Sequence, residues 1–459
     1  MSEASPSPDG RWIVFTVVSL GLLMSSLDQT IVATALHNLQ QELHTSLTWA
    51  SWTLTVYALG RMVLLPLAGR LSDEYGRRRV FLASALVFTT ASLCCGLATN
   101  IYLLIVLRAI QAIGGAGFTP SATGLVVDSF GSARDRVVGL FGAIFPIGAM
   151  LGPLLGGVLV AFWSWRGIFL VNVPIGVMLI VLGLRFLPPD VPRHQGEPWR
   201  MDVAGMVLLV AGVVGAMTAL SYLGGKHTSM WSPEFVGPAI VGVVATAAFL
   251  RHVSRSSHPL VPPRFIHGPV FGAVNAINLL YGGAVTGFVA LIPLYATTRY
   301  GIGVLGSGTL LTAQGVSVIA LSALAVFALR RTGHRLPLYS GSLVTALGMV
   351  ALAVPPVGVP AYVWLAGGAC LIGAGTGWAS PASRNAGLQL APEHAASLAA
   401  LRTMSRQVGS IGSVSVATAI IAQADDPGRT HAFIYAAFGL LLLAAIPIIR
   451  RIPDHRGAW

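Results

Sequence analysis

Long apolar runs recur along almost the whole chain, from Trp12 to Ile449. Hydrophobic residues make up 54% of the 459 residues and charged residues only 10%, whereas a soluble domain carries about 25% charged residues. So few charges cannot cover a water-exposed surface of this size, and no polar block is long enough to fold separately. The sequence therefore predicts an all-α polytopic membrane protein.

A membrane-spanning helix needs about 20 mainly apolar residues, and breaking the sequence at polar and Gly/Pro clusters predicts fourteen such segments. They are Trp12–Leu36, Trp49–Ala68, Val80–Ala98, Ile101–Val127, Val137–Phe162 and Gly167–Leu187; Val203–Leu223 and Phe235–Leu250; and Val270–Thr297, Val304–Leu329, Leu338–Val354, Ala361–Pro381, Ser397–Ala422 and Ala432–Ile449. We expect two six-helix bundles, 1–187 and 270–459, joined by a linker at 188–269 that adds two membrane helices.

The net charge of +12 is compatible with a nucleic-acid partner only if the basic residues form a patch. They fall instead in alternate loops, as the positive-inside rule describes. With the N-terminus in the cytoplasm, the inner loops hold most of them, including Arg193, Arg200 and Arg456, while the outer loops hold Arg166, Lys226, Arg299 and Arg429. This distribution predicts that both termini are cytoplasmic, that anionic lipid headgroups contact that face, and that nucleic acid is not a partner.

Two pairs of short motifs suggest an internal repeat. Gly115-Ala116-Gly117-Phe118 matches Gly375-Thr376-Gly377-Trp378, and Gly76-Arg77-Arg78 matches Gly333-His334-Arg335 at nearly the same separation. Together with the six, two and six pattern, these matches favour two bundles in parallel orientation. In transporters built this way, the substrate path lies between the halves near mid-membrane.

Asp28 is the deepest carboxylate in any predicted segment, and Arg108 lies at a similar depth in the fourth. Charges near the bilayer centre cost about 2.5 to 3.5 kcal/mol on insertion scales, so they are paired, water-facing or functional. If the first and fourth segments are neighbours, the two side chains can pair. The pair is either a titratable site for protons or cations, or a structural ion pair between two helices.

Further polar side chains are candidates for a cavity lining. Arg61 either faces a cavity or extends its guanidinium towards the cytoplasmic edge; in the first case it favours neutral, zwitterionic or anionic substrates. The other candidates are Tyr57, Gln111, Asn172, Asn275, Asn278, Tyr281 and Gln314, each of which can equally join helices by hydrogen bonds.

The loop from Gly69 to Arg79 combines two glycines with Asp73, Arg77 and Arg78. We expect Gly69 and Gly76 to allow sharp turns between two helices, and Asp73 to lie near the N-terminus of the next helix, where the helix dipole favours negative charge. The arginines can bind carboxylates of neighbouring helices.

In the fifth segment, the run from Gly148 to Gly157 places small residues four apart. Gly148, Gly152, Gly156 and Gly157 predict close approach of a neighbouring helix, and Pro153 predicts a bend.

These motifs resemble those of the major facilitator superfamily, in particular its fourteen-helix drug:proton antiporter family, over nearly the whole chain. Gly69–Arg79 resembles motif A, and Gly148–Gly157 resembles motif C, the antiporter motif. Motif B is matched by Arg108, Gln111, Gly114, Gly115 and Ala116, and the stretches Leu27–Leu36 and Trp165–Gly176 resemble two motifs of the fourteen-helix branch.

The resemblance implies alternating access between two six-helix bundles, with proton entry driving export. It assigns Asp28 to proton or substrate binding and Arg108 to proton relay. Asp73 with the motif A arginines would latch the cytoplasmic side, and motif C would limit leak. The sequence departs from the family at Arg61, where a small residue is usual, and in the second half, where Glu393 near a helix end is the nearest approach to an embedded acid.

The expected function is therefore proton-coupled export of amphiphilic drugs or antibiotics across the bacterial cytoplasmic membrane. A dedicated exporter of one endogenous metabolite or self-made antibiotic would carry the same motifs. A membrane enzyme is a remote alternative, because the histidines are scattered and none pairs with a carboxylate at metal-ligand spacing. We expect no metal and no cofactor, the proton gradient being the energy source.

Overall fold

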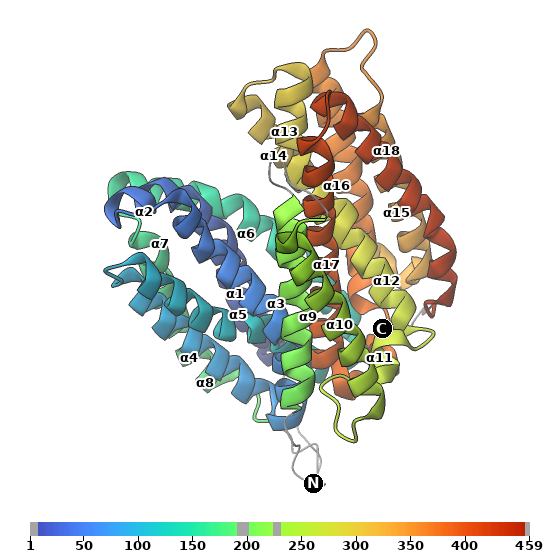
Figure 1. The fold of residues 1–459 in the computed structure, drawn as a ribbon. Coiled ribbons are helices and arrows are strands. Elements are labelled where there is room, and N and C mark those ends of the chain that lie inside the picture. Colours follow the sequence, from blue (N-terminus) through green and yellow to red (C-terminus); the bar gives the residue numbers. More distant parts are fainter. Residues whose placement is uncertain (1–7, 191–201, 224–230, 455–459) are drawn as a thin grey trace. The chain divides into compact units, whose positions relative to one another are not determined.

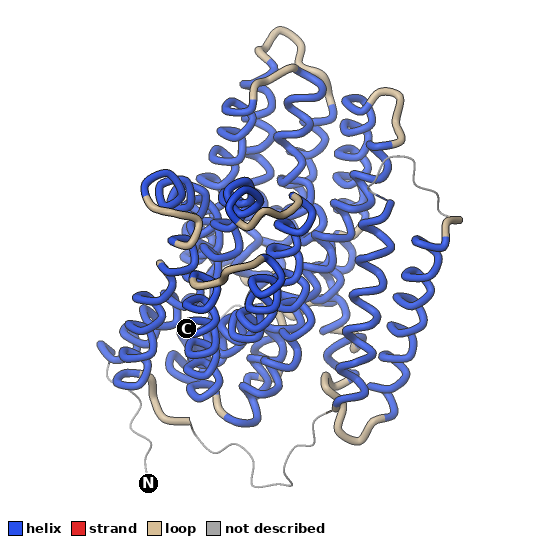
Figure 2. The backbone as a smooth tube through the Cα atoms, turned by 60° about the vertical axis from the view of Figure 1, so that its left-hand side comes forward, coloured by secondary structure: helices blue, strands red, loops and turns tan. Residues whose placement is uncertain are grey.

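The computed structural model describes residues 8–190, 202–223 and 231–454. Within these ranges the chain consists of helices joined by short loops, with no strand (Figure 2). The predicted inner-loop residues Arg193, Arg200 and Arg456 and the outer-loop Lys226 lie outside the described residues.

The chain divides into two compact units (Figure 1). The first contains the described residues of 1–199 together with 390–401, and the second contains those of 200–389 and 402–459. The short segment 390–401 therefore packs with the first unit although it is distant from it in sequence.

In the first unit, α1 packs against α6, and α5 packs against α3 and α4. The helices are α1 (Pro8–Ile31), α2 (Leu36–Glu42), α3 (Leu47–Tyr75), α4 (Arg77–Gly96), α5 (Ile101–Phe130), α6 (Arg134–Phe162), α7 (Gly167–Leu170) and α8 (Asn172–Phe186). A 3-10 turn at Val32–Ala35 connects α1 with α2.

In the second unit, α9 pairs with α10, and α16 packs against α14 and α15. The helices are α9 (Val203–Leu223), α10 (Pro233–Arg255), α11 (Pro263–His267), α12 (Phe271–Tyr281), α13 (Phe288–Tyr300), α14 (Val304–Thr332), α15 (Arg335–Ala353), α16 (Ala361–Asn385), α17 (Ala395–Ala422) and α18 (Pro427–Ala444). The first residues of α17 belong to the first unit.

Eleven helices within the described residues are long and apolar enough to cross a membrane. The predicted segments Val270–Thr297, Ala361–Pro381 and Ser397–Ala422 are helical but are not among these eleven. The first of them is interrupted by a π-helical turn at Gly282–Gly287 between α12 and α13. The second is rich in glycine, and the third contains several serines and two arginines. The all-helical membrane fold is thus present, and the number fourteen stays a prediction.

Polar side chains fix where several helices begin. The side chain of Ser46 accepts a hydrogen bond from Trp49 N–H at the start of α3, Asn100 accepts one from Leu103 N–H at the start of α5, and Asp426 does the same at α18. Such caps satisfy amide groups that have no partner within the helix, so the polar residues between apolar runs set the helix ends.

Glycines let helices approach closely in both units. A Cβ added at Gly117 would meet Ser84 Oγ on α4, and one added at Gly375 would lie 2.5 Å from the carbonyl oxygen of Gly341 on α15. The glycine motifs of the proposed repeat therefore serve helix packing on α5 and on α16, as small residues do in membrane helices.

Candidate functional site

Asp28 and Arg108 form a buried ion pair in the first unit. The distance between Arg108 Nη1 and Asp28 Oδ2 is 2.8 Å, and both side chains are 0% exposed. Helices α1 and α5 pack against each other, so the condition under which the sequence predicted that the two side chains can pair is met.

Two amide side chains complete the surroundings of Asp28. Gln111 Nε2 donates to Asp28 Oδ1 (3.1 Å) and Asn172 Nδ2 donates to the same oxygen (3.3 Å). Gln111 Oε1 in turn accepts from Arg108 Nη1 (2.7 Å). Gln111 and Asn172 are also buried, so we call Asp28, Arg108, Gln111 and Asn172 the Asp28 cluster.

Helix α3 holds the Arg108 guanidinium from the other side. Arg108 Nε donates to the carbonyl oxygen of Thr53 (3.1 Å), and Cζ lies 4.0 Å from the centroid of the Tyr57 ring. A cation over an aromatic face is stabilised, most strongly where water is excluded. Tyr57, a cavity candidate, thus contacts the ion pair directly.

Arg61 is buried in the same region. Its side chain is 1% exposed, and its charge interacts with Tyr57 and Asp28. Helix α3 continues for almost four further turns beyond Arg61, to Tyr75, and this burial fits extension of the side chain to the cytoplasmic edge poorly.

The candidates of the second unit are dispersed. Asn275 donates to the carbonyl oxygens of Phe265 and Ile266 at α11, and Gln314 lies half-buried on α14. Asn278 and Tyr281 are buried on α12. Asn278 Oδ1 accepts from Ser383 Oγ of α16 (3.0 Å), and the Tyr281 hydroxyl lies 2.8 Å from Ser342 Oγ of α15.

Near Asn278 and Tyr281, the structure places charged residues that the sequence analysis did not select. Arg384 ends α16, Arg402 and Arg406 lie on α17, and the three charges interact with one another. The available signal was their position within or just after apolar segments that contain no carboxylate.

Asp73 lies inside α3 and binds the N-terminus of α17, which corrects the expectation that it serves the next helix. Its carboxylate accepts hydrogen bonds from Ser397 N–H (2.9 Å) and Ala396 N–H (3.3 Å). The N-terminus of α4, the helix that follows α3, is bound by Asp190, whose carboxylate accepts hydrogen bonds from Arg78 N–H (2.8 Å) and Arg79 N–H. Both carboxylates occupy the favourable end of a helix dipole.

The two motif A glycines differ in role. Gly76 adopts φ +110° between α3 and α4, and there it makes the expected turn. Gly69 does not turn the chain, because α3 continues through it. A Cβ at Gly69 would instead lie 2.8 Å from the Ala400 side chain of α17, so this glycine permits close packing.

Arg77 is buried and bonded to several partners. It lies 2.7 Å from Asp128 and 3.6 Å from Asp73, and it donates to the carbonyl oxygen of Pro392 (2.9 Å) just before α17. Arg78 donates through its side chain to the carbonyl oxygen of Leu184. The motif A loop is therefore a bonded junction between α3, α4 and the segment 390–401.

Three of the motif C glycines face α1 and the 3-10 turn that follows it. A Cβ at Gly148 would meet Ser26, one at Gly152 would meet Thr30, and one at Gly156 would meet Thr34, all closer than 2.5 Å to the hydroxyl oxygen. A Cβ at Gly157 would meet nothing within 4 Å, so Gly157 does not contribute to this close packing. Helix α6 remains continuous through Pro153.

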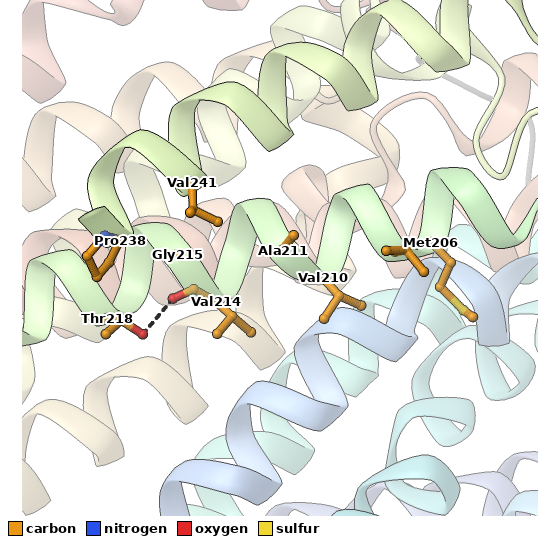
Figure 3. A pocket seen from close by; sticks show the side chains of 9 residues that line it. Met206, Val210, Ala211, Val214, Gly215, Thr218, Pro238 and Val241 are labelled. Atoms are coloured by element: carbon orange, nitrogen blue, oxygen red, sulfur yellow. Dashed lines mark hydrogen bonds between the residues drawn. The ribbon is translucent and has the colours of Figure 1, made fainter. Parts of the chain in front are cut away.

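An apolar groove of about 520 Å³ lies between α9 and α10 in the second unit (Figure 3). Valine and alanine side chains of α9 face Pro238 and Val241 of α10, and the one hydrogen bond drawn, from Thr218 Oγ1 to the carbonyl oxygen of Val214, lies within α9. The groove contains no charged side chain and does not include any of the predicted site residues.

Membrane-length helices that pack through glycines around a buried ion pair are typical of integral membrane proteins such as transporters. The family model of the Major Facilitator Superfamily matches residues 18–414, and the chain belongs to this superfamily. It is accordingly a transporter and not an enzyme.

Curated relatives align over much of the chain. The chain is 33% identical over 78% of its length to "Multidrug resistance protein 3" of Bacillus subtilis, covering 69% of that protein. It is 32% identical over 97% of its length to "Puromycin resistance protein pur8" of Streptomyces alboniger, covering 92% of it. The alignment with "Multidrug transporter protein MdtP" of Bacillus subtilis, at 30% identity, spans 74% of this chain and 62% of that protein.

Solved structures share the fold at low sequence identity. The human organic anion transporter MFSD10 matches with a TM-score of 0.69 and 15% identity over 97% of this chain and 100% of that chain. The proton:xylose symporter XylE matches with a TM-score of 0.65 and 13% identity over 97% and 96% of the two chains.

Proposed function

We propose that the protein exports amphiphilic drugs or antibiotics from the cytoplasm in exchange for protons, by alternating access in the bacterial cell membrane. The observation that carries this proposal is the Asp28 cluster: a carboxylate that is 0% exposed, 2.8 Å from an arginine. Relatives whose names refer to multidrug and puromycin resistance support export of drugs.

The chemistry of the cluster suits proton coupling. A proton and the Arg108 guanidinium compete for the Asp28 carboxylate. When Asp28 takes up a proton, Arg108 loses its counter-charge in a site of low dielectric, which is strongly unfavourable. Protonation therefore favours a conformation in which Arg108 has another partner, and this shift is the step that links proton entry to movement of the helices.

In this proposal the chain crosses the membrane fourteen times with both termini in the cytoplasm. Residues 1–187 and 270–459 form the two moving bundles, and 188–269 holds the inserted helix pair. Asp73 and Arg77, bonded to the first turn of α17 and the residues before it, act as the cytoplasmic latch. The proton gradient is the only energy source, no cofactor takes part, and anionic headgroups contact the basic inner loops.

A dedicated exporter of one endogenous metabolite or self-made antibiotic is the second candidate, favoured by the relative named for resistance to a single drug and aligned over 97% of this chain. A panel of structurally unrelated drugs separates the two candidates: a polyspecific exporter protects cells against several of them, and a dedicated exporter against one.

Transport by inverted membrane vesicles tests the proposed function. Rhodamine B uptake is measured with an imposed pH gradient for the wild type and Asp28→Asn, with Asp426→Asn as the matched control because Asp426 caps α18 away from the cluster. We expect gradient-driven uptake to be abolished in Asp28→Asn and retained in the control. Gradient-dependent uptake by Asp28→Asn at the wild-type rate would contradict the assigned role of the carboxylate.

A further inference from the structure

The second half of the chain has arginines within its helices but almost no acids. The sequence contains no aspartate or glutamate from residue 235 to 392 or from 394 to 424. The helices in this stretch nevertheless carry Arg384, Arg402 and Arg406. In the first unit, by contrast, Arg77 and Arg108 each lie within hydrogen-bonding distance of a carboxylate. The positive charges of α16 and α17 are thus not balanced by a carboxylate of these helices.

Arg406 lies deep along α17. An α-helix rises 1.5 Å per residue, so Arg406 is about 16 Å from the first residue of α17, which is about half of the hydrocarbon thickness of a bilayer. A guanidinium at such depth is retained where it is paired or functional.

The arginines lie together with the polar side chains of α12. Arg402 donates through Nη1 to the carbonyl oxygen of Arg384 in the last turn of α16, and Arg402 is 5% exposed. The charge of Arg406 acts on Tyr281. A Cβ added at the next residue, Gly282, would lie 2.0 Å from the carbonyl oxygen of Arg406, so α12 and α17 touch at this point.

The backbone is irregular at the same point. The π-helical turn Gly282–Gly287 begins directly after Tyr281. Such turns inside helices frequently occur at functional sites, because they change which side chains share a face. The irregular turn, the buried tyrosine and the arginine charges therefore coincide in one region of the second unit.

Like charges that lie close together repel one another, and an anion between them relieves that repulsion. We propose that Arg384, Arg402 and Arg406 bind the anionic group, such as a carboxylate, of the transported molecule. Guanidinium groups suit this task because their planar donors match a carboxylate in two parallel hydrogen bonds. This inference rests on the proposed transport function and defines its substrate class as amphiphiles that carry an anionic group.

Dye binding to the purified full chain in phosphatidylcholine nanodiscs tests this assignment. Rhodamine B carries a carboxylate that its ethyl ester lacks, so the ratio of their affinities, measured by fluorescence anisotropy, isolates the contribution of that group. We expect the wild type to bind the acid about tenfold more tightly than the ester, the scale of a hydrogen-bonded charge. Arg406→Gln should bring the ratio close to one, and Arg406→Lys should restore part of it.

Arg429→Gln is the matched control, since Arg429 lies at the start of α18 and stacks on Phe433, and its affinity ratio should equal that of the wild type. Thermal unfolding of each variant shows that it is folded. The proposal would be overturned by any of three results. The wild type could bind acid and ester with equal affinity, it could bind neither dye, or Arg406→Gln could leave the affinity ratio unchanged.

The same chemistry could be supplied by a lipid headgroup, and native mass spectrometry separates the two sources. Loss of bound phosphatidylglycerol in Arg406→Gln, without any change in the dye ratio, would assign the site to lipid and overturn the substrate assignment. Because binding is measured without a pH gradient, its result is independent of proton coupling: a failed vesicle assay with intact carboxylate selectivity would reject the antiport proposal alone.

Discussion

The Asp28–Arg108 pair illustrates how a membrane protein keeps charges in its interior. Each charge has lost its solvent contact, and the cost is offset by the partner charge and by hydrogen bonds from Gln111 and Asn172 to Asp28. Removing one member of such a pair leaves the other charge unbalanced, whereas removing both can be nearly neutral.

We therefore predict strong coupling between Asp28 and Arg108 in protein stability. Arg108→Gln alone should reduce the free energy of unfolding by about 3 to 5 kcal/mol, and the double variant Asp28→Asn/Arg108→Gln should recover most of this loss. Thermal unfolding of the four proteins of this double-mutant cycle in one detergent measures the coupling. Additive effects of the two substitutions would contradict the pairing.

The glycines of motif C offer a second prediction with an internal control. In Gly152→Ala the new Cβ would lie 1.9 Å from Thr30 Oγ1, so α1 and α6 must separate, at a cost of about 1 to 3 kcal/mol. Gly157→Ala on the same helix meets nothing within 4 Å and should be neutral or slightly stabilising, because alanine favours helix. Equal thermal stability of the two variants would show that the motif does not act through this contact.

The sequence predicted that Asp28 and Arg108 can pair, but it did not predict the other side chains that hydrogen-bond to them. Helix rise placed Asp28 and Arg108 at one depth, since depth follows from counting residues along each helix. It did not show that Asn172 or Gln111 bonds to Asp28, because bonding depends on how α5 and α8 are rotated. For the same reason the sequence left Arg61 with two alternatives, a side chain that faces a cavity and one that extends to the cytoplasmic edge; the structure shows that it is buried.

The helices themselves were predicted more securely than their interruptions and ends. The lengths of the apolar runs predicted where the segments lie. The π-helical turn at Gly282–Gly287 was not predicted, because the spacing of apolar residues there does not differ from that of a continuous helix. Asp73 was assigned to the wrong helix because an aspartate before Gly76 resembles a cap in sequence. Its true partner, the N-terminus of α17, is more than 300 residues away in the chain.

The α9–α10 pair is fastened at one end by Asp202, which precedes α9. Burial raises the pKa of this carboxyl, but hydrogen bonds from Gly205 N–H (2.8 Å), the His252 ring (2.7 Å) and Leu260 N–H (3.0 Å) lower it, and the net result is a pKa below its usual value. The ionised form thus joins α9, the end of α10 and the segment that follows.

A pH dependence follows, with a defined sign. Because the folded pKa of Asp202 is depressed, its contribution is fully present above the ordinary carboxyl pKa of about 4 and is lost as the pH falls through the folded pKa. Asp202→Asn should therefore speed hydrogen exchange in the first turn of α9 at pH 7, as loss of a helix cap worth about 1 kcal/mol does. The matched variant Glu234→Gln, in the first turn of α10, should leave exchange at α9 unchanged.

The distribution of basic residues over the whole molecule predicts its orientation. In a background without the native cysteines Cys94, Cys95 and Cys370, a cysteine at Val357 should react with a membrane-impermeant maleimide in intact cells, because the loop between α15 and α16 is expected outside. A cysteine at Ser257, after α10, should react only when the cells are opened. The reverse pattern would invert the topology.

The scarcity of acids in the second half also bears on how the membrane potential acts on the cycle. Asp28 is the deepest carboxylate of the predicted segments, so for the proposed antiport we predict that a single proton enters per molecule exported. Exchange of that proton for the cationic ethyl ester of rhodamine B moves no net charge, whereas exchange for zwitterionic rhodamine B carries one positive charge inward. One charge crossing 100 mV is worth about 2.3 kcal/mol. At constant pH, a potential set with valinomycin should therefore accelerate export of the acid and leave export of the ester unchanged. The charge of the substrate would then determine which component of the proton motive force drives its transport.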